Sequence, residues 1–285
     1  MTQLVELQDR IDEFRAAGFD VYAISYDFQP ALQRFADRYS ITYDLLSDAG
    51  SVVIRRFGIL NTIIDPRDRR AWPYYGIPFP GTYVVNESGV VTEKFFNRHY
   101  ATRTSPATIL DKALGRMLAR PESPAAMRRG RQATVTAFFG GKDLKLEVAN
   151  TLHVRLELPE GLHVYGEPLP EGFHKTTVTL RPSAGIRVGT PIYPPTTPKS
   201  FGALGVTLNV YAGVVDVRVP VTRNAKWNSL AELRGRLGFP PLTAMDLDIV
   251  VNYQACSETI CFRPESVRLS VTVPTTDLVY PTIEK

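Results

Sequence analysis

The chain has 285 residues, a length typical of about two domains. Its apolar content of 44% and aromatic content of 10% suffice for packed cores and exclude a disordered chain. The 33 basic and 29 acidic residues are interspersed and leave a net charge of +4, which does not point to a nucleic-acid partner. No run of about 18 apolar residues is present, and we therefore expect no membrane span.

The first segment alternates helical and strand patterns. Leu4, Leu7, Ile11 and Phe14 recur at spacings of three and four, which predicts a helix that ends at Gly18. The elements expected after it are a strand at 21–25, a helix at 30–39, a strand at 43–47, a helix capped by Ser47 or Asp48 and running to 57, a loop at 61–76, two strands within 81–96 around an Asn-Glu-Ser-Gly turn, and a helix at 106–120. This αβαβαββα order predicts an α/β domain with helices covering a central sheet.

A proline-containing basic stretch, ARPESPAAMRRGRQ, follows at 119–132 and has no hydrophobic period, which predicts a linker at 119–131. Beyond it, short alternating runs such as LHVRLEL, VVDVRVPV and DLDIVVNY are separated by frequent turns. Strands at this spacing are typical of an all-β, antiparallel sandwich of the immunoglobulin-like kind, with one or two helical turns inserted at 229–239. We predict an α/β domain at 1–118 and an all-β domain at 132–279.

Three stretches of the first segment, QLVELQDRIDEFRAAGFDVYAIS, YDLLSDAGSVVIRRFGI and GIPFPGTYVVNESGVV, resemble the alkyl hydroperoxide reductase/thiol-specific antioxidant group. The resemblance implies a peroxiredoxin-like domain with the thioredoxin fold. In that group a proline with a cis peptide bond precedes the strand beside the active site, and Pro80 stands at the matching position. By this resemblance Pro80, Gly81 and Thr82 would contact the extended chain or the sulfur of a substrate or partner. The alternative is an ordinary loop shaped by Pro78 and Pro80.

The first segment departs from that group at its beginning. Related redoxins carry a strand and a Trp-Cys-Pro-x-Cys motif ahead of the first helix, where the helix N-terminus lowers the pKa of the thiol. Here Met1 to Leu4 stand immediately after the place where the motif would end. We expect a thioredoxin-like domain incomplete at its N-terminus, through truncation or a misplaced start, with no thiol chemistry in 1–118. A degenerate domain that has lost its nucleophile is the alternative.

The two cysteines of the chain, Cys256 and Cys261, lie in YQACSETICFRP. The stretches GLHVYGEPLPEGFHKTTVTL at 161–180 and VVNYQACSETICFRPESVRLSVTV at 250–273 resemble the N-terminal domain of the thiol:disulfide interchange protein, an immunoglobulin-like module. The resemblance implies that Cys256 and Cys261 form a reversible, catalytic disulfide that a thioredoxin-like partner reduces. It also implies that the protein uses no cofactor other than this redox-active disulfide.

Physical arguments favour exchange but leave alternatives open. Two cysteines are no disulfide framework, and a six-residue ring would stabilise the fold by only about 2 kcal/mol. A short exposed ring suits exchange better than stapling. One alternative is a disulfide that pins the hairpin and never turns over. Another is a metal site, which would need two more ligands, and the histidines have no zinc-site spacing: His99, His153, His163 and His174.

Two further side chains near these motifs are open to interpretation. His163 and Tyr165, in GLHVYG, are expected to pack within the sandwich rather than to bind a metal. Tyr253 approaches the cysteine pair along the chain and either shields the sulfurs and contacts a partner or packs in the core.

These observations favour a thiol-dependent oxidoreductase that reduces a peroxide or a protein disulfide, with a thioredoxin-like protein as electron donor or acceptor. The alternative is a non-catalytic thioredoxin-fold binding or scaffold protein. The expected localisation is divided. Glu6, Asp9 and Asp12 interrupt any apolar core of a signal peptide, which favours the cytoplasm. The interchange-type domain belongs by resemblance to the periplasm, and a start upstream of Met1 would remove the first argument.

Overall fold

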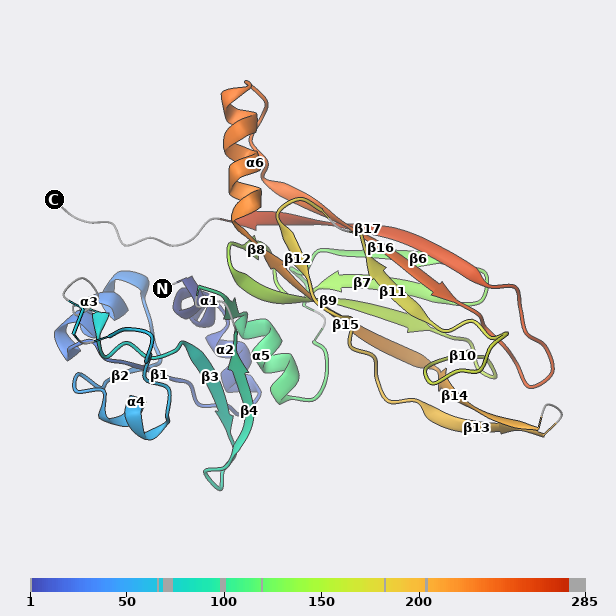
Figure 1. Cartoon of the computed structure of the whole chain (residues 1–285), viewed down its shortest axis with the longest axis horizontal. Coiled ribbons are helices and arrows are strands. Elements are labelled where there is room, and N and C mark those ends of the chain that lie inside the picture. Colours follow the sequence, from blue (N-terminus) through green and yellow to red (C-terminus); the bar gives the residue numbers. More distant parts are fainter. Residues whose placement is uncertain are drawn as a thin grey trace. The chain divides into compact units, whose positions relative to one another are not determined.

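Figure 1 shows the computed structural model, which describes residues 2–65, 67–68, 74–97, 101–118, 120–181, 183–202 and 205–276. The chain divides into two compact units, the first formed by Met1–Arg116 and the second by Met117–Asp277. The elements of the first unit are α1 (Thr2–Asp9), α2 (Ile11–Ala16), β1 (Tyr22–Ser25), α3 (Gln29–Tyr39), β2 (Asp44–Ser47), α4 (Val52–Arg56), β3 (Gly81–Val85), β4 (Val91–Phe96), β5 (Arg103–Thr104) and α5 (Pro106–Ala113).

Two element boundaries of the first unit follow from local hydrogen bonding. Gly18 adopts a left-handed conformation with φ of 80°, and the next amide donates to the Phe14 carbonyl at 2.9 Å, which ends the first helical region where predicted. Helix α4 begins where the Asp48 carboxylate accepts the amide hydrogens of Val52 and Ile54, at 2.8 and 2.9 Å. Asp48, rather than Ser47, is therefore the capping residue. The first predicted helix is divided into α1 and α2 by a turn at Arg10.

The central sheet predicted for the first unit is instead two separate pairs of strands. β1 and β2 run parallel, with Tyr22 opposite Asp44, and β3 and β4 are antiparallel. Over the described residues no ladder joins the two pairs. The connections explain the two orientations. Helix α3 carries the chain back between β1 and β2, so these strands run parallel, whereas the short turn at 86–89 reverses the chain between β3 and β4, so these strands are antiparallel.

The second unit is built almost entirely of strands. One sheet has the order β12-β15-β9-β7-β6, a second β11-β16-β17-β8, and a third β10-β14-β13. Its elements are β6 (Ala125–Arg129), β7 (Thr134–Phe139), β8 (Leu144–Lys145), β9 (Val148–Glu157), β10 (His163–Tyr165), β11 (Thr177–Leu180), β12 (Ile186–Val188), β13 (Thr197–Phe201), β14 (Val206–Ala212), β15 (Val214–Arg223), α6 (Ala225–Arg236), β16 (Ala244–Tyr253) and β17 (Glu265–Thr276).

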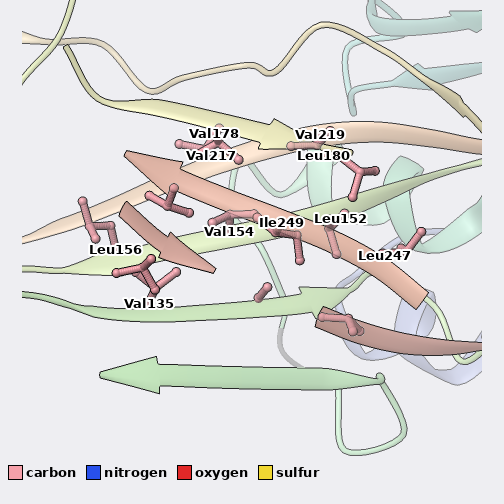
Figure 2. Close-up of a cluster of buried hydrophobic side chains, with 14 of the residues drawn as sticks. Val135, Leu152, Val154, Leu156, Val178, Leu180, Val217, Val219, Leu247 and Ile249 are labelled. Carbon is pink, nitrogen blue, oxygen red and sulfur yellow. The ribbon is translucent and has the colours of Figure 1, made fainter. Parts of the chain in front are cut away.

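The core of the second unit lies between the inner faces of the first two sheets, as Figure 2 shows. Strand β16 illustrates the pattern, because Leu247 and Ile249 are buried whereas Asp246 and Asp248 between them are exposed. This alternation directs one face of the strand into the core and the other into water. A set of branched side chains fills the layer: Val135, Leu152, Val154, Leu156, Val178, Leu180, Val217, Val219, Leu247 and Ile249.

Two expectations for the second half of the chain are corrected. The stretch predicted as a linker contains β6, which pairs with β7 from Ala125 opposite Phe138 to Arg129 opposite Thr134. The all-β unit therefore begins ahead of Ala125 rather than at 132. An edge strand with largely exposed side chains lacks apolar alternation, so its pattern resembles that of a linker. Helix α6 has 12 residues and is longer than the one or two turns predicted.

Across the described parts of the chain, none of the helices combines the length and apolar character needed to cross a bilayer.

Candidate functional site

Cys256 and Cys261 are joined by a disulfide with an S–S distance of 2.14 Å, in the loop between β16 and β17. Their backbones oppose each other as an antiparallel bridge, with Cα atoms 4.1 Å apart. The loop is closed by the Ser257 amide, which donates to the Ile260 carbonyl at 2.8 Å, and by the Ser257 hydroxyl, which accepts the Ile260 amide hydrogen at 3.1 Å. The pair therefore sits at the base of a tight turn, as the spacing allowed.

The two cysteines differ in solvent access. Cys256 is fully buried, with 0% of its surface exposed, whereas Cys261 is exposed. Beside it, Ile260 leaves 60% of its surface exposed. Of the two residues, Cys261 is therefore the one on the surface of the unit.

Strand β10 carries two polar aromatic residues, His163 and Tyr165, that lie beside the cysteine pair. His163 opposes Cys256, and each amide donates to the other's carbonyl at 2.9 Å. Directly opposed residues project their side chains from the same face, and a residue two positions further along a strand shares that face. Tyr165 occupies that position, and its hydroxyl lies 3.6 Å from the Cys261 sulfur. The site thus has an imidazole beside one cysteine and a phenol beside the other.

Aromatic rings enclose this corner of the unit. The ring of Tyr165 packs edge-on against Phe173, with centroids 5.3 Å apart, and His163 packs against Phe201 at 5.2 Å. Burial raises the pKa of the Tyr165 hydroxyl, which therefore stays protonated and can donate to sulfur. An ion pair between Lys199 and Glu258 joins β13 to the cysteine loop.

His163 is 1% exposed, and neither of its ring nitrogens has a hydrogen-bond partner among the residues that the structure describes. Burial lowers the pKa of the imidazole, and the cationic Lys199 lowers it further, while Glu258 acts in the opposite direction. The neutral form is thereby favoured. The prediction that His163 and Tyr165 pack within this unit is confirmed. Their position beside the sulfurs was not predicted, although both lie in the GLHVYG motif.

Tyr253 belongs to the main core rather than to the surroundings of the sulfurs. It is 1% exposed, and its hydroxyl donates to Glu265 at 2.7 Å. Burial, together with the Glu265 hydrogen bond, raises the pKa of this hydroxyl. Tyr253 therefore packs in the core, which was one of the two interpretations of the sequence.

Pro80, Gly81 and Thr82 lie in the first unit, at the start of β3. The peptide bond before Pro80 is trans, contrary to the expectation, and the cis bond found over the described residues is Glu167–Pro168. The chain before Pro80 is held by the Phe79 amide, which donates to the Ile59 carbonyl at 2.6 Å.

Pro80 borders a cavity of about 620 Å³. Part of its wall is aromatic, because Tyr83 packs at a tilt against Phe57 and edge-on against Phe96, with centroids 5.4 and 5.2 Å apart. The ring of Phe96 lies over Gly81, where an added Cβ would approach it to 2.2 Å. Only glycine fits this position, so Gly81 has a packing role.

Among the described residues no group of three or more histidine, cysteine or carboxylate side chains is arranged to hold a metal ion. His153 stacks on Phe138 with centroids 4.8 Å apart, and His174 is exposed. His99 lies outside the described residues.

Comparison with known families divides the chain in the same way. Residues 1–94 match the AhpC/TSA family, and residues 143–272 match the N-terminal region of the thiol:disulfide interchange protein DsbD. The chain thus joins a segment similar to the AhpC/TSA family, here called the redoxin segment, to a segment similar to the DsbD N-terminal region. Together the two matches support a thioredoxin-like domain followed by an immunoglobulin-like β domain, and they suggest a function related to thiol oxidoreduction.

Curated relatives match the redoxin segment. Peroxiredoxin Q from Arabidopsis thaliana chloroplasts is 33% identical over 89 residues, which is 31% of this chain and 37% of the relative. Peroxiredoxin Bcp from Escherichia coli K12 is 40% identical over 57 residues, or 20% of this chain and 36% of the relative. The chain thus spans less than half the length of these relatives.

Solved structures are also similar to part of the chain, at low sequence identity. The N-terminal periplasmic domain of ScsB from Proteus mirabilis is 14% identical with a TM-score of 0.32, and covers 55% of this chain and 49% of its own. The reduced DsbD N-terminal domain from Neisseria meningitidis is 16% identical with a TM-score of 0.28, at 56% and 96% coverage. A third structure, at 15% identity, a TM-score of 0.28 and coverages of 56% and 94%, is a complex between the DsbD and PilB N-terminal domains of that organism.

Proposed function

We propose that the chain is a thiol–disulfide oxidoreductase of the redoxin class, in which Cys256 and Cys261 exchange two electrons with a thioredoxin-like partner protein. The observation that carries the proposal is the unequal burial of the two cysteines, with Cys256 buried and Cys261 exposed. A purely structural disulfide needs no such access. Thiol exchange needs one sulfur that a partner can attack.

The exchange follows from this geometry. A partner thiolate attacks the Cys261 sulfur, the bond to Cys256 breaks, and Cys256 leaves as a thiolate. A second partner thiol then attacks the mixed disulfide, which releases the chain with both cysteines reduced and the partner oxidised. Run in reverse, the chain reduces a protein disulfide. The exposed Ile260 offers an apolar contact for the partner beside the reacting sulfur.

The redoxin segment supplies the other half of the proposal. By its resemblance to peroxiredoxins, the terminal acceptor is a peroxide or a protein disulfide, with the redox-active disulfide as the only cofactor-like group. We assign the redoxin-type domain to residues 1–118, where Pro80, Gly81 and Thr82 would contact the substrate or partner. The interchange-type domain then extends to about residue 279.

Thiol counting on the purified chain tests the proposal. The expected result is no free thiol before reduction and two after mild dithiol treatment, followed by insulin or peroxide turnover with a thioredoxin system. A pair that stays oxidised under mild dithiol contradicts it. A matched pair of variants sharpens the test: Cys256→Ser leaves the accessible Cys261, which should trap a partner as a mixed disulfide, whereas Cys261→Ser should not.

A second candidate function is binding without catalysis, and the aromatic cavity beside Pro80 favours it. The cavity is lined by Phe57, Tyr83 and Phe96 and contains no thiol. On this hypothesis the first unit holds an apolar ligand or segment, and Cys256→Ser leaves the biological activity intact. Loss of activity in that variant would favour the redox function instead.

A further inference from the structure

His163 is a buried titratable side chain that packing alone does not explain. It is 1% exposed and, over the described residues, both ring nitrogens lack a hydrogen-bond partner. Buried polar groups are nearly always paired, because an unpaired one loses its hydration without compensation. An apolar residue would fill the same space without that cost. The unpaired imidazole therefore points to a use for its nitrogens.

The position of the imidazole identifies the group it serves. His163 is the direct cross-strand neighbour of Cys256, held there by two backbone hydrogen bonds of 2.9 Å. Opposed side chains of this kind have Cβ atoms roughly 5 Å apart on the same face of the sheet. The other cysteine has its own polar neighbour, the Tyr165 hydroxyl, 3.6 Å from the Cys261 sulfur.

We propose that His163 is the base that removes the proton from the buried Cys256 thiol when the disulfide re-forms. This inference rests on the proposed redox function of the pair. It assigns to His163 a role in proton transfer that neither cysteine can perform for itself.

The need for a base follows from the burial of Cys256. A thiol in apolar surroundings ionises less readily than one in water, yet only the thiolate attacks a disulfide. Water does not reach Cys256, which has no exposed surface. A local proton acceptor must therefore stand in for solvent, and a neutral imidazole is suited to this role.

The groups around the imidazole fit a proton acceptor. Lys199 of β13 and Glu258 of the cysteine loop are its charged neighbours, and Tyr165 of its own strand is the titratable one. Burial and Lys199 hold the pKa of His163 below its usual value near 6.5, so the ring is neutral at pH 7. Glu258 is placed to moderate the charge of the imidazolium once the proton arrives.

The step balances as follows when oxidised glutathione serves as the oxidant. The Cys261 thiolate attacks glutathione disulfide, which forms a mixed disulfide at Cys261 and releases one glutathione thiolate. His163 then takes the proton of the Cys256 thiol, and the Cys256 thiolate attacks the Cys261 sulfur. The second glutathione leaves as a thiolate, two electrons have passed to glutathione, and the imidazolium loses its proton to solvent.

The test compares His163→Gln with His174→Gln in the full chain, because His174 is an exposed imidazole outside the site. Reduced protein is mixed with oxidised glutathione, and the mixed disulfide is followed by mass spectrometry across pH 5 to 9. In His163→Gln we expect formation of the mixed disulfide to be unchanged and its resolution to slow by about 100-fold at pH 7. The rate of resolution in this variant should rise with pH up to the high pKa of the bare thiol. The wild type and His174→Gln should instead lose this rate only as pH falls through the lowered imidazole pKa.

The outcomes separate the two hypotheses. If the wild-type pair neither reduces nor re-forms, the proposed redox function is wrong. If it does both and His163→Gln resolves the mixed disulfide at the wild-type rate and with the wild-type pH profile, the role of His163 is wrong. If His163→Gln does not fold, a measurement on the wild type still tests the role of His163. In an NMR titration of the histidines, reduction of the pair should shift the pKa of His163, and an unshifted His163 overturns the inference.

Discussion

Removal of the Cys256–Cys261 disulfide should leave the chain folded, and this expectation separates a redox pair from a structural staple. The bond closes a ring of only six residues, with a sequence separation of 5. Loop-closure entropy for such a ring amounts to about 2 kcal/mol at 25 °C, against a stability of about 5–15 kcal/mol for a typical domain. The turn also keeps other supports, including the Ser257 hydrogen bonds and the backbone pairing of His163 with Cys256.

The double variant Cys256→Ala/Cys261→Ala tests this, together with the reduced wild type. For a unit of this size, about 2 kcal/mol corresponds to a fall in Tm of about 4–8 °C. Scanning calorimetry gives the shift, and circular dichroism and amide hydrogen exchange report whether the strands persist. Unfolding of the second unit on reduction at 25 °C, or a loss well above 5 kcal/mol, would refute the reasoning and establish the disulfide as a staple.

Three further expectations concern single positions. In the presence of iodoacetamide, Cys256→Ser should be alkylated at Cys261 at least tenfold faster than Cys261→Ser is alkylated at the buried Cys256, and equal rates would contradict the assigned asymmetry. Ile260→Asp should slow reduction by a thioredoxin-like protein while leaving reduction by dithiothreitol unchanged; an equal loss with both reductants would mean that Ile260 is no partner contact. Gly81→Ala should destabilise the first unit by about 1–3 kcal/mol, because the Cβ of the alanine would lie 2.2 Å from the Phe96 ring. A urea titration measures this loss, and an unchanged midpoint would show that the ring moves freely.

Local patterns in the sequence were sufficient to place most elements of both units. The Asp48 cap and the left-handed Gly18 depend on residues within a few positions of each other, and both were predicted. Strands with one buried face, such as β16, show their alternation directly. Edge strand β6 lacks that signal, because pairing on one side only leaves its side chains exposed.

The surroundings of the cysteine pair could not be predicted from such patterns. Cys256 and Cys261 are neighbours along the chain, but His163 meets Cys256 across a separation of 93 positions. Strand register over that distance is set by the packing of the whole sandwich, and a shift by one residue would turn His163 to the opposite face. The GLHVYG motif therefore indicated that His163 and Tyr165 pack within the sandwich without showing that they lie beside the cysteine pair.

The arrangement around the disulfide also gives the two cysteines different surroundings. Cys256 lies three residues after the end of β16 and is held by two backbone hydrogen bonds to His163, and its side chain packs with Tyr165, Leu208 and Val210. Cys261 lies on the exposed return of the loop, where the Tyr165 hydroxyl is 3.6 Å from its sulfur. Exchange requires the attacking, central and leaving sulfurs to approach a line, which an exposed cysteine allows more easily than a buried one. On the proposed function, the outer cysteine therefore exchanges with the partner, while the inner cysteine, opposite His163, closes the ring.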